Sequence, residues 1–176
     1  MKKDNLKSLI VLSAICLVVA ILMGAVNYIT SPVIKENEDK KVQDSLKAVM
    51  PNASGFEEEA LPDDAPKTVK AIYRDKEKTG FAISVATESA YSSNPMTFTV
   101  AVDNDGKIID VTLTGYSETK DFGKDTYPKN YVGADVSSVE GIDLCSGVTY
   151  SSTAFRNAMS DALKTLGMIV KRGGEA

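Results

Sequence analysis

The sequence predicts an α+β protein in which one N-terminal transmembrane helix is followed by a single domain with an antiparallel sheet and packed helices. Three observations carry this prediction. Residues 8–34 form a run without charge, four segments between residues 68 and 114 are typical of short strands, and an amphipathic helical pattern follows residue 150. Of the 176 residues, 43% are hydrophobic and 25% are charged, a composition typical of globular proteins.

Composition also excludes several classes of function. The net charge of −4 argues against a nucleic-acid partner, which favours a basic face. The chain has no histidine and two cysteines, so we expect no zinc, haem or iron–sulfur site built by this chain alone, and no Ser–His or Cys–His catalysis. Cys16 and Cys145 lie in segments of different kinds and are not expected to pair. Any redox chemistry therefore needs a bound organic cofactor.

The apolar run predicts a membrane anchor. We assign residues 1–7 to a short basic tail and residues 8–31 to a transmembrane helix that Pro32 is expected to close. Residues 9–26 are almost wholly apolar, and eighteen helical residues span about 27 Å, close to the hydrocarbon thickness of a bilayer. A cleaved signal peptide, a lipoprotein and a pilin are the alternatives. The run is long for a signal peptide, Ile15 precedes Cys16 where a lipoprotein needs a small residue, and a pilin's acidic residue is missing.

Orientation follows from charge. Lysines flank the run on both sides, but those that follow it alternate with acidic residues, whereas the tail is net basic. This pattern favours a cytoplasmic N-terminus and an extracytoplasmic domain at the cell membrane.

Residues 32–66 are predicted to be an amphipathic stalk followed by an acidic loop. Val42, Leu46, Val49 and Met50 recur at helical spacing, and Pro51 is expected to stop the helix. This helix is either a polar stalk or a docking surface near the membrane. Residues 56–66 are acidic and contain proline, which predicts a solvated loop.

The domain is predicted to span residues 67–172. Strands are expected at 68–73, 80–87, 96–102 and 107–114, with a hairpin turn at 103–106 between the last two. That turn is not expected to be an EF-hand calcium loop, because Ala101 and Thr112 would be its first and last ligands and neither has a carboxylate. The inward residues expected from alternation are Phe81, Ile83, Val85, Phe98, Val100, Val102, Ile109, Val111 and Leu113. The final helix should bury Ala154, Phe155, Ala158, Met159, Ala162, Leu163 and Leu166, with Ser151, Ser152 or Thr153 as its N-cap.

The stretch 143–152 joins a loop to this helix. It is rich in small residues and hydroxyls, and helix starts present unpaired N–H groups that favour negative charge. The residues alone therefore predict either a turn that holds a phosphate or carboxylate, or a capping turn with no ligand.

The same stretch resembles a known signature. Ser146-Gly147-Val148-Thr149 with Ser151 and Ser152 is similar to the S-G-A-T-x-S-S sequence of FMN-binding domains, with Val148 in place of the usual alanine. D-G-K-I at residues 105–108 and Glu118-Thr119 follow the family's order as well. This family includes the G subunit of Rnf-type electron-transport complexes and the C subunit of sodium-pumping NADH:quinone reductases.

The resemblance implies a covalent flavoprotein. It implies that Thr149 carries FMN through a phosphoester, that a flavin transferase makes this bond, and that the transferase reads Asp143, Ser146, Gly147 and Thr149. Threonine is a poor nucleophile without a base, which agrees with attachment by another enzyme. The implied cofactor contacts are Thr149, Ser146, Gly147, Val148, Ser151, Ser152, Glu118 and Thr119.

The implied function is that of an electron-carrier subunit without catalysis of its own. It would relay electrons in an Rnf-type complex that couples ferredoxin and NAD redox chemistry to ion translocation, beside integral-membrane and iron–sulfur subunits. Two alternatives stay open: another membrane-anchored FMN-binding reductase or regulator, and a non-redox extracytoplasmic binding module.

Overall fold

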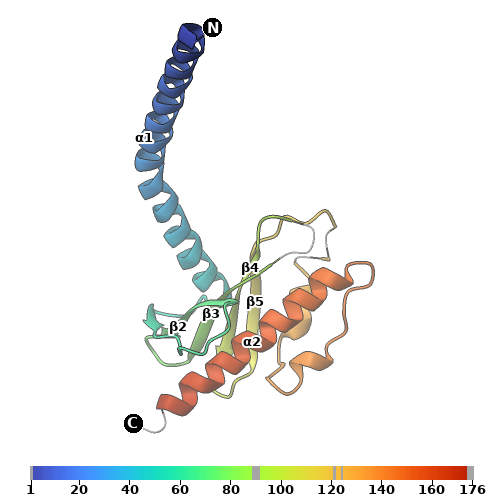
Figure 1. Cartoon of the computed structure of the whole chain (residues 1–176). Coiled ribbons are helices and arrows are strands. Elements are labelled where there is room, and N and C mark those ends of the chain that lie inside the picture. Colours follow the sequence, from blue (N-terminus) through green and yellow to red (C-terminus); the bar gives the residue numbers. More distant parts are fainter. Residues whose placement is uncertain (1, 89–91, 121, 124, 174–176) are drawn as a thin grey trace. The chain divides into compact units, whose positions relative to one another are not determined.

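The structure, a computed structural model, describes residues 2–88, 92–120, 122–123 and 125–173 (Figure 1). Met1, the first residue of the predicted tail, lies outside them. The chain forms two compact units, residues 1–41 and 42–176. The elements in order are α1 (Lys2–Val49), β1 (Phe56–Glu59), β2 (Val69–Asp75), β3 (Gly80–Thr87), β4 (Met96–Asp103), β5 (Ile108–Gly115), the 3₁₀ helices η1 (Tyr127–Tyr131) and η2 (Val139–Gly141), and α2 (Thr149–Gly173).

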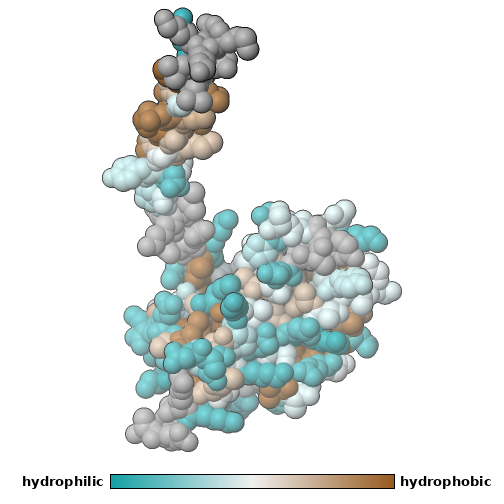
Figure 2. All heavy atoms as spheres, in the orientation of Figure 1, coloured by the Kyte–Doolittle hydropathy of each residue, from teal (hydrophilic) through white to brown (hydrophobic). Residues whose placement is uncertain are grey.

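The first unit is the N-terminal part of α1. In the described part of the chain, one helical stretch, the 23 residues Ile10–Pro32, is long and apolar enough to cross a membrane. Its apolar side chains are exposed along α1 (Figure 2). The prediction that Pro32 closes this helix is wrong, because Pro32 lies inside α1. Proline removes one backbone donor and crowds the preceding turn, and here the helix continues past it.

The second unit is built on a five-stranded antiparallel sheet with strands in the order β1-β2-β3-β4-β5. The predicted α+β architecture is therefore confirmed. β3 has the predicted bounds, and β2, β4 and β5 lie within two residues of theirs. The turn between β4 and β5 is confirmed too: the Asp103 carboxylate accepts the N–H groups of Asp105 and Lys107, and Gly106 has a φ of +80°. Gly106 supplies the positive φ that such turns require.

One predicted inward residue of β5 is wrong. Ile109 is 44% exposed, whereas Ile108 is buried. The cause is a β-bulge: Val102 pairs with Ile108 and Ala101 pairs with Asp110, so Ile109 has no partner in the ladder. An extra residue of this kind reverses the alternation of side chains.

Residues 42–66 belong to the same compact unit as the sheet. Leu46, Val49 and Met50 are buried against Ala82 and Ala101, so the helical face predicted from their spacing is confirmed, and it packs on the sheet. The prediction of a solvated loop over residues 56–66 is wrong at its start, because Phe56–Glu59 pairs with β2 as the edge strand β1. Edge strands often carry charged side chains, which keep the sheet from pairing with other chains. The charges of this segment are therefore compatible with a strand at the edge of the sheet.

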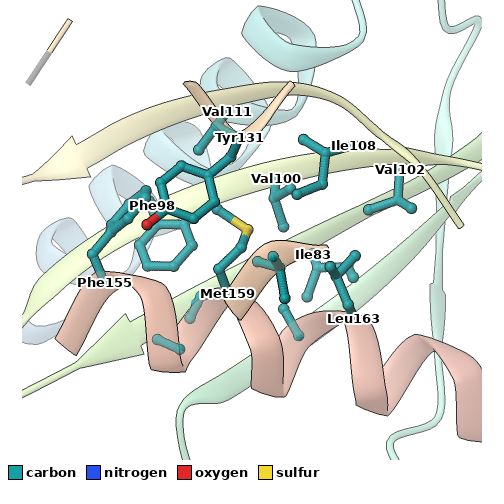
Figure 3. Close-up of a cluster of buried hydrophobic side chains, with 14 of the residues drawn as sticks. Ile83, Phe98, Val100, Val102, Ile108, Val111, Tyr131, Phe155, Met159 and Leu163 are labelled. Atoms are coloured by element: carbon teal, nitrogen blue, oxygen red, sulfur yellow. The ribbon is translucent and has the colours of Figure 1, made fainter. Parts of the chain in front are cut away.

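The main core lies between α2 and the other face of the sheet (Figure 3). Phe155, Met159 and Leu163 of α2 pack onto Ile83 and Phe98 of the strands, all of them buried. Figure 1 shows α2 lying across the strands. The predicted apolar face of this helix is confirmed, and this packing fixes the position at which α2 begins.

Candidate functional site

The signature stretch forms a tight turn that leads directly into α2. The N–H of Val148 donates to the carbonyl of Cys145 at 3.2 Å, and Gly147 has a φ of +82°. A Cβ on Gly147 would meet no atom within 4 Å, so glycine is needed for its backbone conformation rather than for close packing inside the protein. α2 begins at Thr149, so the prediction of an N-cap at Ser151, Ser152 or Thr153 is wrong: all three lie inside the helix. Thr149 and Ser146 are exposed.

Ser151 and Ser152, which follow this turn, stabilise it through hydrogen bonds. Ser152 is fully buried. Its hydroxyl accepts the N–H of Cys145 at 3.2 Å and reaches the carbonyl of Val148 at 3.0 Å. Ser151 is also fully buried, and its hydroxyl donates to the carboxylate of Glu118. Both hydroxyls are thus engaged within the protein, so their observed contacts stabilise the turn and the start of α2.

Two loops converge on the start of α2. The Ser151–Glu118 hydrogen bond ties the segment after β5 to the helix. The hydroxyl of Tyr116 in that segment donates to the carbonyl of Lys120. The hydroxyls of Ser92 and Ser117 lie 2.7 Å apart, which joins this segment to the segment before β4. The Glu118-Thr119 pair of the sequence signature therefore lies beside the Thr149 turn.

A cavity of about 470 Å³ opens where these segments meet. Its lining residues are Thr119, Lys120, Gly147, Val148, Thr149 and Tyr150. Val148 lies between the cavity and the core, because it is also buried in the main cluster. Tyr150 is 70% exposed, so it offers an aromatic side chain to whatever enters the cavity.

The upstream part of the stretch is fixed by its backbone. The side chain of Arg156 donates to the carbonyl of Ile142 at 3.4 Å, and the hydroxyl of Tyr127 donates to the carbonyl of Asp143 at 3.1 Å. Asp143 itself is exposed. Tyr127 also pairs with Tyr131, and burial together with this hydrogen bond raises the pKa of Tyr131 above its ordinary value.

These features fit a flavin phosphate at Thr149. Cavities that hold cofactors commonly measure roughly 300–1,000 Å³, and this one has Thr149 in its wall. The start of α2 at Thr149 is the positive end of the helix dipole, which favours a phosphate. Among the described residues, no group of three or more His, Cys, Asp or Glu side chains is arranged to hold a metal.

The structure divides the predicted site residues into three groups. Thr119, Gly147, Val148 and Thr149 line the cavity. Glu118, Ser151 and Ser152 support the turn through hydrogen bonds, while Ser146 and Asp143 lie exposed on the turn and just before it.

Sequence reasoning missed two lining residues, Lys120 and Tyr150. Tyr150 stands at the variable position of the signature, next to Thr149, and its position in the motif could have indicated it. Nothing in the pattern around Lys120 marks it as a cavity residue.

Comparisons with known proteins agree with this geometry. Residues 91–164 match the model of the FMN-binding domain family. The chain is also 27% identical over 169 residues to the G subunit of the proton-translocating ferredoxin:NAD(+) oxidoreductase complex of Clostridium ljungdahlii, and the match covers 87% of this chain and 86% of that protein. The resemblance drawn from residues 146–152 is confirmed in that residues 91–164, which contain this stretch, are similar to the FMN-binding domain family.

Proposed function

We propose that this protein is a membrane-anchored electron carrier whose FMN is joined to the hydroxyl of Thr149 by a phosphoester. The observation that carries the proposal is the position of Thr149, an exposed residue at the first position of α2 in the wall of the cavity. The chain has no histidine that could activate a threonine for catalysis, so Thr149 suits attachment by a separate flavin transferase.

The residues around Thr149 have separate tasks in this proposal. The start of α2 stabilises the negative charge of the phosphate. Val148, Thr119 and Tyr150 border the cavity, where they would contact a bound flavin. Ser151 and Ser152 hold the turn from below, and Asp143, Ser146, Gly147 and Thr149 form the sequence that the transferase reads. When bound, the flavin would supply one- and two-electron transfer.

The proposed setting is an Rnf-type complex at the cell membrane. The relative from Clostridium ljungdahlii is named as part of a ferredoxin:NAD(+) oxidoreductase complex, and the likeness over most of the chain supports the same setting here. Residues 8–31 would anchor the protein as a single span, with residues 1–7 in the cytoplasm and the FMN-binding domain outside. Its partners would be integral-membrane and iron–sulfur subunits, and the coupled reaction would move ions.

The test uses membranes that contain the whole complex. We expect Thr149→Ala to reduce ferredoxin-dependent NAD reduction at least tenfold. A Thr153→Ala control, which removes a hydroxyl one turn further along α2, should retain it. Equal activity of all three proteins would contradict the electron-carrier proposal. A different result would be a protein that carries flavin but belongs to no complex, with neighbouring genes that encode no membrane or iron–sulfur subunits. That result would instead indicate a membrane-anchored reductase or regulator.

A further inference from the structure

Two buried tyrosines lie beneath the segment that precedes Thr149. Tyr127 and Tyr131, the first and last residues of η1, have their hydroxyl oxygens 3.1 Å from each other. The hydroxyl of Tyr127 donates to the carbonyl oxygen of Asp143 at 3.1 Å. Each hydroxyl can donate one hydrogen bond. Tyr127 donates to Asp143, so in the pair of hydroxyls it accepts the hydrogen bond from Tyr131. The hydrogen bonds therefore run in one direction, from Tyr131 to Tyr127 to the backbone of Asp143.

Aromatic packing fixes the rings that carry these hydroxyls. The ring of Tyr127 meets Phe122 edge to face at 5.1 Å between centroids, and the ring of Tyr131 meets Phe155 edge to face at 5.2 Å. Tyr131 is fully buried and Tyr127 nearly so. Rings held in this way have little rotational freedom. The Tyr127 hydroxyl therefore offers Asp143 a donor at a fixed position.

In the segment 143–149 the backbone is fixed, whereas the side chains of Asp143, Ser146 and Thr149 are exposed. The N–H of Cys145 is bound to Ser152, and its sulfur reaches the carbonyl of Phe122 at 3.8 Å. Of the hydrogen bonds found in the described residues, the one from Tyr127 is the one that holds the carbonyl of Asp143. The side chains of Asp143, Ser146 and Thr149 are exposed. A surface of this kind suits recognition by an enzyme that binds the segment before modifying it.

We propose that Tyr127 is a positioning residue for the modification of Thr149: it holds Asp143 so that Asp143 and Thr149 meet the modifying enzyme as one preformed surface. This inference rests on the proposed function. In the modification, a bond forms between the Thr149 hydroxyl oxygen and the flavin-side phosphorus of a flavin dinucleotide. The phosphoanhydride bond of that donor breaks, the nucleoside monophosphate leaves, and the threonine proton passes to solvent. No oxidation or reduction takes place.

Three variants of the full chain in detergent separate positioning from folding. Tyr127→Phe removes the bond to Asp143 and leaves the buried hydroxyl of Tyr131 without its acceptor, which destabilises the fold. The double variant Tyr127→Phe/Tyr131→Phe also lacks the bond to Asp143, but it removes both hydroxyls, and replacing both partners by apolar groups is nearly neutral for stability. Tyr131→Phe is the matched control, because Tyr127 can still donate to Asp143.

The measurements are the initial rate of flavin attachment by purified transferase, the KM for the acceptor protein, and hydrogen exchange of the 143–149 segment. We expect Tyr127→Phe and the double variant to be modified about fivefold to tenfold more slowly, the effect of one lost hydrogen bond. Most of this loss should appear as a higher KM for the acceptor. The amide of Cys145 should exchange faster in both variants, while Tyr131→Phe stays within about twofold of wild type in rate, as expected when the bond itself is kept.

Two results would overturn the inference and leave the proposed function intact. One is equal attachment rates in all four proteins. The other is a double variant that regains the wild-type rate together with its stability, because the tyrosines would then act through folding alone. A wild-type protein that is never modified would contradict both the proposed function and this inference.

Discussion

Phe155 connects the core to the start of α2, and its replacement by alanine is the sharpest test of the fold. The side chain is fully buried. Its ring lies 4.5 Å from Phe98, 5.2 Å from Tyr131, 5.8 Å from Phe122 and 6.1 Å from Tyr127, measured between centroids. Because the side chain has four ring contacts and is fully buried, Phe155→Ala should lower the free energy of unfolding by about 4–5 kcal/mol, the upper end of the usual range for Phe→Ala.

This loss is a large share of the free energy of unfolding of an ordinary domain, about 5–15 kcal/mol. With a urea m-value of about 2 kcal/mol per molar, the midpoint of unfolding should fall by about 2 M. The assay is urea unfolding of the full chain in detergent, followed by circular dichroism, because the chain has no tryptophan to report by fluorescence. Asn157→Ala, at an exposed position of the same helix, should change the free energy by less than about 0.5 kcal/mol. A midpoint shift below about 0.5 M for Phe155→Ala would refute this account of the core.

Three further predictions concern hydrogen bonds around the site and along α2. Ser151→Ala should destabilise the domain by about 1–3 kcal/mol in urea unfolding, since it removes a buried donor to the Glu118 carboxylate; an unchanged midpoint would contradict that role. The raised pKa of Tyr131 means that the folded state keeps its proton longer than the unfolded state, so this residue's contribution is intact below about pH 10 and is lost as the pH rises further. Tyr131→Phe should therefore flatten the alkaline loss of stability, and parallel curves for both proteins would argue against it. The pKa of Glu140 is lowered by its hydrogen bonds with Lys164 and Ser160, so its contribution is present above its ordinary pKa and is lost as the pH falls below it. Lys164→Met should lower the unfolding midpoint more at pH 7 than at about pH 3, and an equal effect at both would count against the pairing.

Much of the fold could be predicted because the spacing of apolar residues in the sequence follows from which side chains are buried. The period of two in β3 and β4 and the helical spacing in α2 both reflect a single apolar face that must meet a core. The bounds of β3 and the buried face of α2 were predicted correctly for this reason. The family signature placed Thr149 beside Glu118-Thr119, and the structure brings these segments together.

The errors arise where tertiary contacts override local pattern. Ile109 lies at a bulge, and alternation cannot show that one residue has been inserted into a ladder. The acidic segment at Phe56–Glu59 becomes a strand because β2 offers it an edge, which no local preference predicts. Pro32 remains within α1, although proline more often ends a helix.

The residues beneath the site were also beyond the reach of sequence patterns. Tyr127 lies 16 residues before Asp143, whose carbonyl it binds, and no spacing rule connects a 3₁₀ helix to such a loop. Lys120 and Tyr150 line the cavity because two loops converge there. Contacts of this kind follow from the packing of α2 on the sheet, so they can be identified only from the folded structure.

The central claim is that Thr149 is the attachment point of the flavin, and the intact mass of the protein tests it most directly. The wild-type chain, Thr149→Ala and Thr153→Ala would each be produced together with a flavin transferase, purified and denatured before mass measurement. The account predicts a gain equal to FMN minus water, with a yellow colour that survives denaturation, for wild type and Thr153→Ala but not for Thr149→Ala. An unmodified, colourless wild-type protein would contradict the account, and it would leave residues 146–152 as a capped turn in a binding module without redox function.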